Sequence, residues 1–297
     1  MTRQTIGTTT KRARAGLNNQ RLVLIGLFAE AHARGVDVVL PDLVNINAAD
    51  TKSSAFIDFG RVFDLGIVRE FLNTHGIDIA EGAGAEQVEW IELFNRGAKA
   101  YANPALAGFV DAALAALRPP APIIAQAEAI LAHLGGEVHA VQLRVERDWQ
   151  IHCDRLMAER PGWDCVRTPE GIFDRIAATP FYGGVRRFLI FCDEAALVAP
   201  PERIAADIRA SHGFDLTFKS MLPRGTATAE LSVEQASIDF EVGLHAKSYV
   251  GLSQSTFSNL LCATKAAKGT DTLDHFTYHV AAPVLFRRCD RGRPGWR

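Results

Sequence analysis

The 297-residue sequence has almost no surplus of charge of either sign: 32 lysines and arginines are balanced by 34 aspartates and glutamates, so the formal net charge is −2. Proteins that bind nucleic acid or an anionic membrane surface use a surplus of positive charge. The sequence therefore excludes a general electrostatic attraction to such partners, and we expect no nucleic-acid partner.

Long apolar stretches are missing as well. No segment reaches the ~18 apolar residues that a membrane-spanning helix needs. The first residues, MTRQTIGTTTKRARAG, also lack the apolar centre of a secretory signal. We therefore expect no stable membrane insertion and a cytoplasmic location.

Cysteine is scarce and scattered along the chain, at Cys153, Cys165, Cys192, Cys262 and Cys289. The number is odd and no two cysteines form a C-x-x-C pair, so the pattern indicates neither a disulfide framework nor a zinc site. We predict that they are mostly buried thiols.

What the chain does contain is an average globular composition. Hydrophobic residues make up 48% and charged residues 22%, which argues against a long disordered tract or a fibrous repeat. The length is about twice the ~150-residue prior for one domain. Prolines at positions 119, 120 and 122 interrupt the chain near its middle. We predict two domains, residues 1–120 and 121–297.

Helical and strand patterns alternate along both predicted domains. The spacing of apolar residues predicts helices over 18–34, 105–117, 124–134, 203–211 and 233–245, and a helix that begins at Ser255; Gly35 is the expected stop of the first. Short apolar runs predict strands over 36–40, 88–93, 138–145, 188–192, 216–219 and 249–252. This alternation predicts an α/β fold with parallel sheets, which bind ligands beyond the carboxyl ends of their strands.

Three sets of polar residues stand where such ligands bind. The first is the string GLNNQR at residues 16–21, where the first predicted helix begins. Gly16 permits close approach of the backbone, and the amides of Asn18 and Asn19, with the helix N–H groups, suit a phosphate or a sugar hydroxyl. The alternative is that an asparagine only caps the helix.

The second set, LRVERDW at residues 143–149, ends the strand predicted at 138–145. A charge-assisted hydrogen bond from Arg144 to the Asp148 carboxylate would fix Arg144 in one rotamer. The planar guanidinium would then be presented to a diphosphate, for which it is better suited than lysine. The alternative is an ordinary salt bridge.

The third set combines Asp239 with GLSQSTFS at residues 251–258, where a predicted strand runs into the last helix. Ser255 and Thr256 would stand at the positive end of the helix dipole, which is a natural phosphate site. A simple helix cap is again the alternative.

In this order, the three sets resemble motifs of the GDP-fucose protein O-fucosyltransferase family, including its large plant branch. Residues 16–21 resemble its G-G-[FL]-[NG]-[NQ]-[QM]-R opening, residues 143–148 its H-L-R-x-E-x-D motif, and residues 239–257 its final block. The resemblance implies a GT-B architecture, with two Rossmann-like domains whose parallel sheets face each other across a cleft. It also implies inverting transfer of fucose from GDP-fucose to a protein or glycan acceptor, with no metal and no other cofactor.

The resemblance gives a role to each matching residue. Arg144 would bind the β-phosphate and stabilise the departing GDP, Asp148 would orient Arg144, and Asp239 would accept hydrogen bonds from guanine. The other donor-binding residues would be Asn18 and Asn19 near the fucose, Arg21 as their support, Gln142, Ser255 and Thr256 at the nucleotide phosphates, and Phe257 near the base or ribose. Arginine and helix N–H groups can stabilise a departing diphosphate without a metal.

The chain departs from the family pattern in three ways. Gln142 replaces the motif histidine and cannot titrate. Residues 8–14 are polar and basic, so the strand expected before the first motif is nearly absent, and the chain is short for the family. The general base also stays open: Glu146 and Asp148 are candidates by position, but on a strand both share a face with Arg144 and could be only its salt-bridge partners. The leaving phosphate is the third candidate.

Two other functions remain open: a nucleotide-binding protein without turnover, and a transferase for another sugar nucleotide. A metal site is a further alternative, because His275 and His279 have the spacing of one helix face. No carboxylate or cysteine pattern completes such a site, so we expect packing or surface roles for both.

Overall fold

The computed structural model describes residues 3–8, 16–46, 54–81, 84–160, 165–269, 274–279 and 282–288. The α-helices are α1 (Leu17–Arg34), α2 (Leu65–Thr74), α3 (Trp90–Ala102), α4 (Ala107–Ala116), α5 (Ala121–Leu134), α6 (Arg147–Glu159), α7 (Pro169–Ala177), α8 (Pro201–His212), α9 (Ser232–His245) and α10 (Thr256–Ala267). Short 3-10 helices are η1 (Phe59–Arg61), η2 (Pro104–Leu106), η3 (Pro180–Tyr182), η4 (Glu194–Ala196) and η5 (Lys219–Met221). The strands are β1 (Thr5–Gly7), β2 (Asp37–Val38), β3 (Leu43–Ile46), β4 (Ser54–Ile57), β5 (Glu86–Gln87), β6 (His139–Gln142), β7 (Arg187–Phe191), β8 (Asp215–Thr217), β9 (Ser248–Leu252), β10 (His275–Tyr278) and β11 (Leu285–Arg287).

The described strands form two parallel sheets and a hairpin. The smaller sheet has the order β2-β1-β5, and the larger has the order β11-β10-β9-β6-β7-β8, in which only β11 is antiparallel to its neighbour. β3 and β4 pair as an antiparallel hairpin. The prediction of parallel sheets in an α/β fold is thus confirmed.

The strand order of the larger sheet reverses beside β6. The chain runs from β6 through β7 to β8 on one side, and then returns to add β9 and β10 on the other side of β6. Crossover connections diverge at such a point and leave a crevice at the carboxyl ends of the strands, where open α/β sheets bind ligands.

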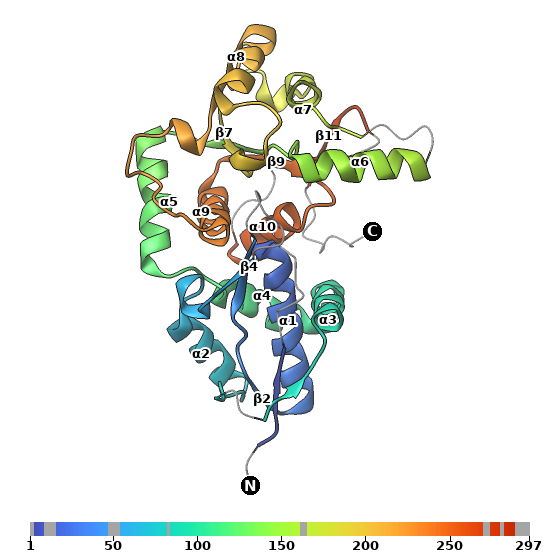
Figure 1. Cartoon of the computed structure of the whole chain (residues 1–297), viewed down its shortest axis with the longest axis vertical. Helices are drawn as coiled ribbons and strands as arrows, with labels where there is room; N and C mark the ends of the chain where they lie inside the picture. Colours follow the sequence, from blue (N-terminus) through green and yellow to red (C-terminus); the bar gives the residue numbers. More distant parts are fainter. Residues whose placement is uncertain are drawn as a thin grey trace.

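Helix α1 occupies the middle of the first part of the chain (Figure 1). Its predicted range is confirmed, and Gly35 ends it in the left-handed conformation with φ 65°. Buried residues lie on nearly all its sides, from Leu17 to Ala31, and a helix that is apolar all round lies inside a protein. It contacts α3 and α4 from its own part of the chain and α9 and α10 from the other.

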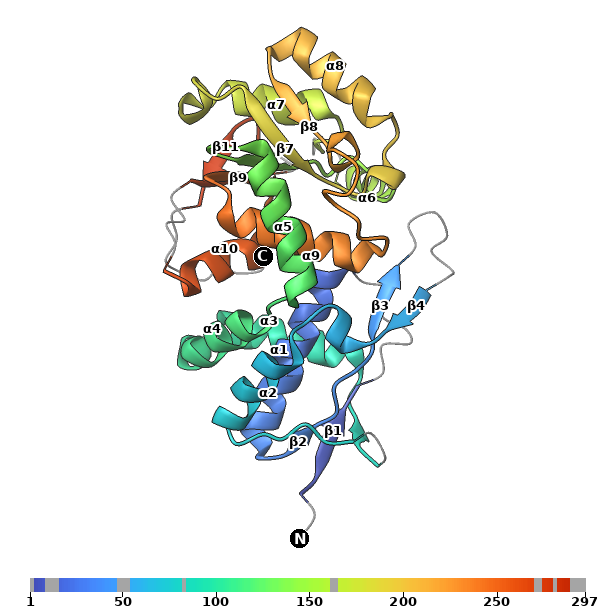
Figure 2. The ribbon, with the colours of Figure 1, turned by 90° about the vertical axis from the view of Figure 1, so that its left-hand side faces the viewer.

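The buried hydrophobic residues in the described ranges form two clusters. The first extends from Ile6 to Leu261 and so includes residues from both sides of position 120. The second lies on the other face of the larger sheet, because Phe188 and Ile190 belong to it whereas Leu189 belongs to the first. The chain passes from α4 to α5 at the prolines (Figure 2), and the domain boundary at position 120 remains a prediction.

Two strand predictions in the first part were wrong. Residues 88–93 are not a strand: Glu89 precedes α3, and the stacked rings of Trp90 and Phe94 show helical spacing. A short apolar run cannot distinguish a strand from a buried helix. A strand does precede the first motif, since β1 pairs with β2 and β5 around Ile6, which is fully buried. Three residues are too few to show an alternation in the sequence.

Cys153 and Cys165 form a disulfide, which corrects the expectation that the cysteines are thiols. Cys192 and Cys262 are not part of this disulfide, and Cys289 lies outside the described residues. The spacing of 12 residues matches no common motif, so the sequence alone could not reveal the pairing. Disulfides are rare in reducing compartments, and the cytoplasmic location remains a prediction.

Reduction of this disulfide is expected to lower the free energy of unfolding by about 3 kcal/mol. The reason is that the bond closes a short loop and so lowers the conformational entropy of the unfolded chain. The measurement is chemical denaturation with and without a reductant. The double variant Cys153→Ala/Cys165→Ala is the control. Its free energy of unfolding should be close to that of the reduced protein and should not change when the reductant is added. An unchanged parent stability on verified reduction would contradict the expectation.

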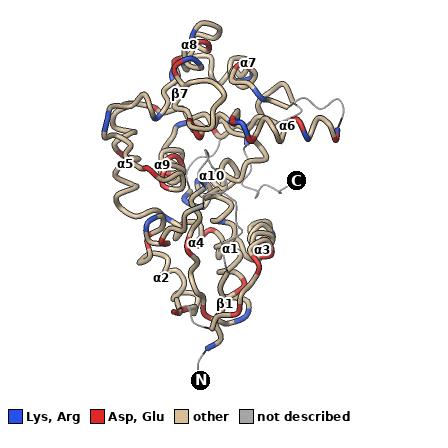
Figure 3. The backbone as a smooth tube through the Cα atoms, viewed as in Figure 1, with Lys and Arg blue, Asp and Glu red and all other residues tan. Residues whose placement is uncertain are grey.

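Acidic and basic side chains are interspersed over both parts of the chain (Figure 3). Within the described ranges, no helix combines the length and the apolar composition needed to cross a bilayer.

Candidate active site

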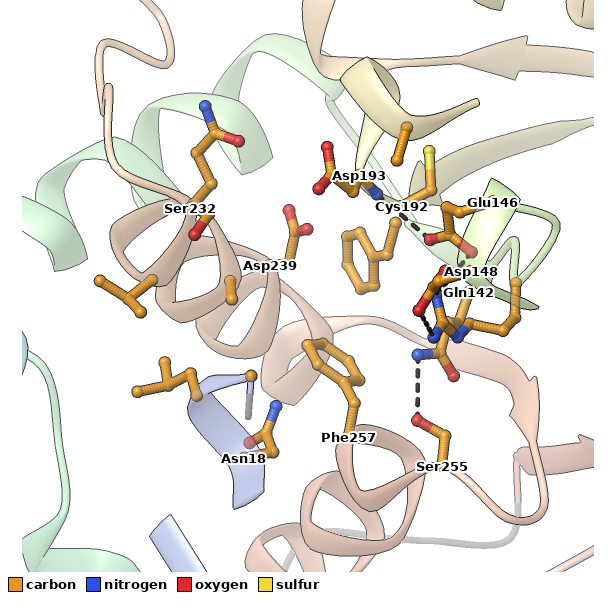
Figure 4. A pocket seen from close by; sticks show the side chains of 18 of the residues that line it. Asn18, Gln142, Glu146, Asp148, Cys192, Asp193, Ser232, Asp239, Ser255 and Phe257 are labelled. Carbon is orange, nitrogen blue, oxygen red and sulfur yellow. Dashed lines mark hydrogen bonds and ion pairs between the residues drawn. The ribbon is translucent and has the colours of Figure 1, made fainter. Parts of the chain in front are cut away.

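A cavity of about 800 Å³ lies at the carboxyl ends of β6, β7 and β9, between the larger sheet and the start of α1 (Figure 4). Residues that follow β6 and β9 border it on one side, and α9 borders it on another. The cavity therefore lies at the point where the strand order reverses, and it is the candidate active site.

Several helices begin at this cavity. Residues 16–19 of α1, 146–148 of α6 and 255–257 of α10 all line it, and their N-cap positions make no side-chain cap hydrogen bond. The first turn of a helix has N–H groups without intrahelical partners and carries a partial positive charge. Helix starts that converge in this way favour an anionic ligand.

The charged side chains that line the cavity nearly cancel: the cations are Arg144, Arg147 and Lys219, and the carboxylates are Glu146, Asp148, Asp193 and Asp239. Ion pairs already join several of them. The attraction for an anion consequently comes from oriented donors at fixed positions rather than from a net positive charge.

Arg144 is held between two carboxylates. Its Nη1 donates to Glu146 Oε2 (2.9 Å) and Asp148 Oδ1 (3.0 Å), and its Nη2 donates to Asp148 Oδ2 (2.6 Å). Burial alone would lower the pKa of Arg144, but the charges of Glu146 and Asp148 outweigh burial and raise it, so the guanidinium stays charged. With 28% of its side chain exposed, Arg144 lines the cavity in a fixed orientation.

The strand geometry predicted for Glu146 and Asp148 was wrong. Strand β6 ends at Gln142, Glu146 is the N-cap of α6, and Asp148 lies in the first turn of that helix. Both carboxylates contact Arg144 because the chain turns from β6 into α6 at this point. Glu146 also accepts a hydrogen bond from the Asp193 N–H (3.3 Å), and its burial raises its pKa against the opposing effect of Arg144.

Gln142 connects the second and third sets of residues. Its Nε2 donates to Ser255 Oγ (3.1 Å), while its Oε1 accepts from Ser258 Oγ (2.9 Å) and Tyr249 Oη (3.3 Å). The neutral amide thus holds the Ser255 hydroxyl at the cavity wall. A side chain at Gly251 would collide with Ser258 and Tyr249, so this close packing requires glycine.

The predicted start of the last helix is confirmed, with Ser255 as the N-cap and Thr256 as the first helical residue of α10. Both line the cavity. The Phe257 ring stacks on Tyr249 (6.2 Å between centroids) and meets Phe240 edge-on (5.6 Å). Phe257 therefore offers the cavity an aromatic surface in a fixed position.

Asn18 and Asn19 lie within the first turn of α1, and the N-cap is Gly16, so neither asparagine caps the helix. Asn18 is 5% exposed and its Oδ1 accepts from Arg21 Nη1 (3.3 Å). Asn19 Oδ1 is buried and has no hydrogen-bond partner among the described residues. A buried acceptor without a partner costs free energy. Because Asn19 lines the cavity, its Oδ1 remains able to accept a hydrogen bond there.

Arg21 lies behind Asn18 and is almost fully buried. Its guanidinium carbon lies 3.8 Å from the ring centroid of Phe240 and 5.5 Å from that of Phe63, so it packs against α9 as a cation–π partner. Burial lowers the pKa of Arg21 to about 10, although Glu241 opposes the shift. Arg21 thereby fixes the start of α1 against the helix that carries Asp239.

Asp239 projects from α9 into the cavity and is paired with Lys219, whose Nζ lies 2.7 Å from Asp239 Oδ2. The sequence reasoning missed Lys219, because it follows β8 inside a segment without any motif. Its place as the last residue of the strand predicted over 216–219 was the only available signal.

Asp193 was also missed. It follows β7 and lines the cavity, and within the described part of the chain its carboxylate makes no hydrogen bond or ion pair. Its position at the end of a parallel strand was again the signal that could have found it.

The helical spacing inferred for His275 and His279 was wrong. His275 belongs to β10, is 1% exposed and packs on the Tyr249 ring (4.8 Å). Burial lowers its pKa well below the usual value, so the ring is neutral. A packing role is confirmed for His275. The described residues contain no group of three or more histidine, cysteine or carboxylate side chains that could hold a metal ion.

Neither a protein-family model nor a curated protein matches the sequence. Solved structures are similar: POFUT1, a GDP-fucose protein O-fucosyltransferase, in complex with GDP has a TM-score of 0.60 and 12% identity over 94% of this chain and 99% of that chain. POFUT1 in complex with GDP-fucose has a TM-score of 0.59 and 13% identity over 94% and 98%. At this identity the likeness shows the fold, and it confirms the expected GT-B-like α/β architecture.

Proposed function

We propose that this protein is a glycosyltransferase with a nucleotide-sugar donor, and that the donor is GDP-fucose and the acceptor a hydroxyl of a protein or glycan. The observation that carries the proposal is the composition of the cavity at the reversal of strand order. Arg144 in a fixed orientation, the buried carboxylate of Asp239 and the uncapped N-termini of three helices all line it. The similar fold of POFUT1, solved with GDP and with GDP-fucose, supports the choice of donor.

The donor would bind along the carboxyl ends of the strands. Its diphosphate would lie between Arg144 after β6 and the start of α10, where the Ser255 and Thr256 hydroxyls add donors to the backbone N–H groups. The nucleoside would extend toward Asp239 along Phe257. The sugar would then face the start of α1, where Asn18 and Asn19 can bind its hydroxyl groups.

In the reaction, the bond between the sugar C1 and the phosphate oxygen breaks, and its electron pair leaves with the nucleoside diphosphate. The acceptor oxygen forms the new bond to C1 from the opposite face, which inverts the configuration, and loses its proton. Arg144 and the helix N–H groups stabilise the growing charge on the diphosphate, so we propose that no metal is needed.

Glu146 and Asp148 act in this proposal as positioning residues for Arg144. Both carboxylates already use their oxygens to hold the guanidinium in place, so neither is left to approach an acceptor hydroxyl. We therefore assign the proton of the acceptor hydroxyl to the leaving phosphate.

A panel of GDP, UDP, GDP-fucose and GDP-mannose is expected to distinguish the donor in a thermal-shift measurement. A ligand at 100 times its dissociation constant should stabilise the fold by about 2.7 kcal/mol, and we expect this for GDP and GDP-fucose. Slow release of fucose from GDP-fucose, unchanged by EDTA, should follow. Stabilisation by GDP without any consumption of GDP-fucose would instead favour a binding protein, and stabilisation by UDP alone another transferase.

A further inference from the structure

The cavity continues into a side cavity of about 310 Å³ beside η4 and η5. Lys219, Cys192 and Asp193 border both spaces, and Ala227, Ala229 and Ile238 add apolar walls to the side cavity. Lys219 therefore stands at the junction between the space assigned to the diphosphate and a smaller space with partly apolar walls.

The backbone at Lys219 is fixed. Glu194 Oε1 accepts hydrogen bonds from the N–H groups of Lys219 (2.7 Å) and Ser220 (3.3 Å) at the start of η5. The ammonium group is then held by Asp239, and the exposed fractions of the two side chains are 12% for Lys219 and 8% for Asp239. A buried ion pair is weak evidence for stability, because both ions lose their hydration. The Lys219–Asp239 pair lies at the junction of two cavities, and this position indicates that it binds a ligand.

The pair leaves hydrogen-bonding capacity unused. An ammonium group has three donors, and the structure uses one of them on Asp239 Oδ2. Asp239 Oδ1 has no hydrogen bond in the part of the chain that the structure describes. A ligand at this point therefore meets N–H donors directly beside carboxylate acceptors.

Among the nucleobases, guanine matches this arrangement best. Its Watson–Crick edge presents the O6 acceptor beside the N1–H and N2–H donors, so a lysine and a carboxylate are both satisfied. Adenine offers one donor and one acceptor there. Uracil places carbonyl groups on both sides of its N3–H, so one of them would face the carboxylate, which only accepts hydrogen bonds.

We propose that Lys219 determines the nucleobase specificity of the site by donating a hydrogen bond to O6 of guanine, while Asp239 accepts from N1–H and the 2-amino group. The inference rests on the proposed function, because it requires a nucleoside diphosphate in the cavity. It adds a residue of η5, far from the three sequence motifs, to the recognition of the donor.

The test measures dissociation constants of the full chain for GDP, IDP and 6-thioguanosine diphosphate by calorimetry. GDP and IDP carry O6, whereas the thio compound keeps N1–H and the 2-amino group but has sulfur, a weak hydrogen-bond acceptor, in place of O6. Lys219→Met should weaken GDP and IDP by about tenfold to a hundredfold, the effect of one charged hydrogen bond, and leave the third ligand unchanged. Lys219→Gln keeps a neutral donor and should weaken GDP and IDP less; it also carries the test if the methionine variant does not fold.

Lys247→Met is the matched control, because Lys247 is half exposed, pairs with Glu137 and lies outside both cavities. Equal weakening of all three ligands by Lys219→Met would show that Lys219 only holds Asp239, and would overturn the proposal. So would an unchanged affinity for GDP. If the unaltered protein binds no nucleoside diphosphate at all, the proposed function itself fails, and this inference with it.

Discussion

Replacement of Arg144 by lysine is expected to lower the turnover of GDP-fucose about a hundredfold to a thousandfold, the effect of removing one oxyanion donor from an active site. Arg144 uses two nitrogens to hold Glu146 and Asp148, and its planar shape lets it present further N–H donors to the cavity. Lysine keeps the charge but cannot hold both carboxylates and two phosphate oxygens in a fixed geometry.

The measurement compares hydrolysis rates and melting temperatures of Arg144→Lys and the parent. Lysine leaves a cation beside the buried Glu146, so the melting temperature should change little. Arg155→Lys, at an exposed position on α6 and outside the cavity, is the control for the substitution itself. Near-parental turnover of Arg144→Lys would remove Arg144 from the mechanism, and an unfolded variant would favour a purely structural salt bridge.

Gly26→Ala is expected to destabilise the protein by about 3 kcal/mol, and Gly97→Ala by a similar amount, at the upper end of the usual cost of overpacking. The two glycines lie where α1 crosses α3. A methyl group on Gly26 would overlap the Leu93 carbonyl, and one on Gly97 would overlap the Leu22 carbonyl. Because the obstacle is backbone, no change of rotamer relieves it and the helices must separate.

The control for this prediction is Gly108→Ala in α4, where a methyl group would meet no atom within 4 Å. Alanine has a higher helix propensity than glycine, so this variant should gain up to about 1 kcal/mol. Chemical denaturation of the three variants gives the comparison. A stabilising effect at Gly26 or Gly97 would mean that the helices do not approach as closely as the structure requires.

Local sequence patterns predicted the elements that depend on local energetics. The limits of α1 follow from its apolar residues and from Gly35, and the start of α10 follows from the hydroxyl residues at the end of β9. The same patterns placed Arg144 and Ser255 at the ends of two parallel strands. Such strands end at one edge of a sheet, and this is why the sequence could anticipate that the two residues border one cavity.

Other features depend on contacts between distant segments, and sequence patterns do not contain them. Cys153 on α6 and Cys165 are bonded to each other in a disulfide, although nothing in their spacing indicates it. The backbone turn between β6 and α6 places Glu146 at the N-cap of α6 and Asp148 in its first turn, rather than along one face of a strand. Short apolar runs such as 88–93 were ambiguous because burial, not local propensity, decides their conformation.

The sequence by itself thus determined the α/β alternation, the parallel sheets and the three sets of residues at the cavity, because each rests on the periodicity or chemistry of a short segment. Only the tertiary structure decided that Lys219 lies against Asp239, that the Asp193 carboxylate is left without a partner in the described part of the chain, and that Gln142 holds Ser255. These relations arise from the strand order, which sets the end of β8 beside α9 and the end of β6 beside the start of α10. The physical reason is that strand order is fixed by the burial of the whole core, to which residues far apart in the sequence contribute together.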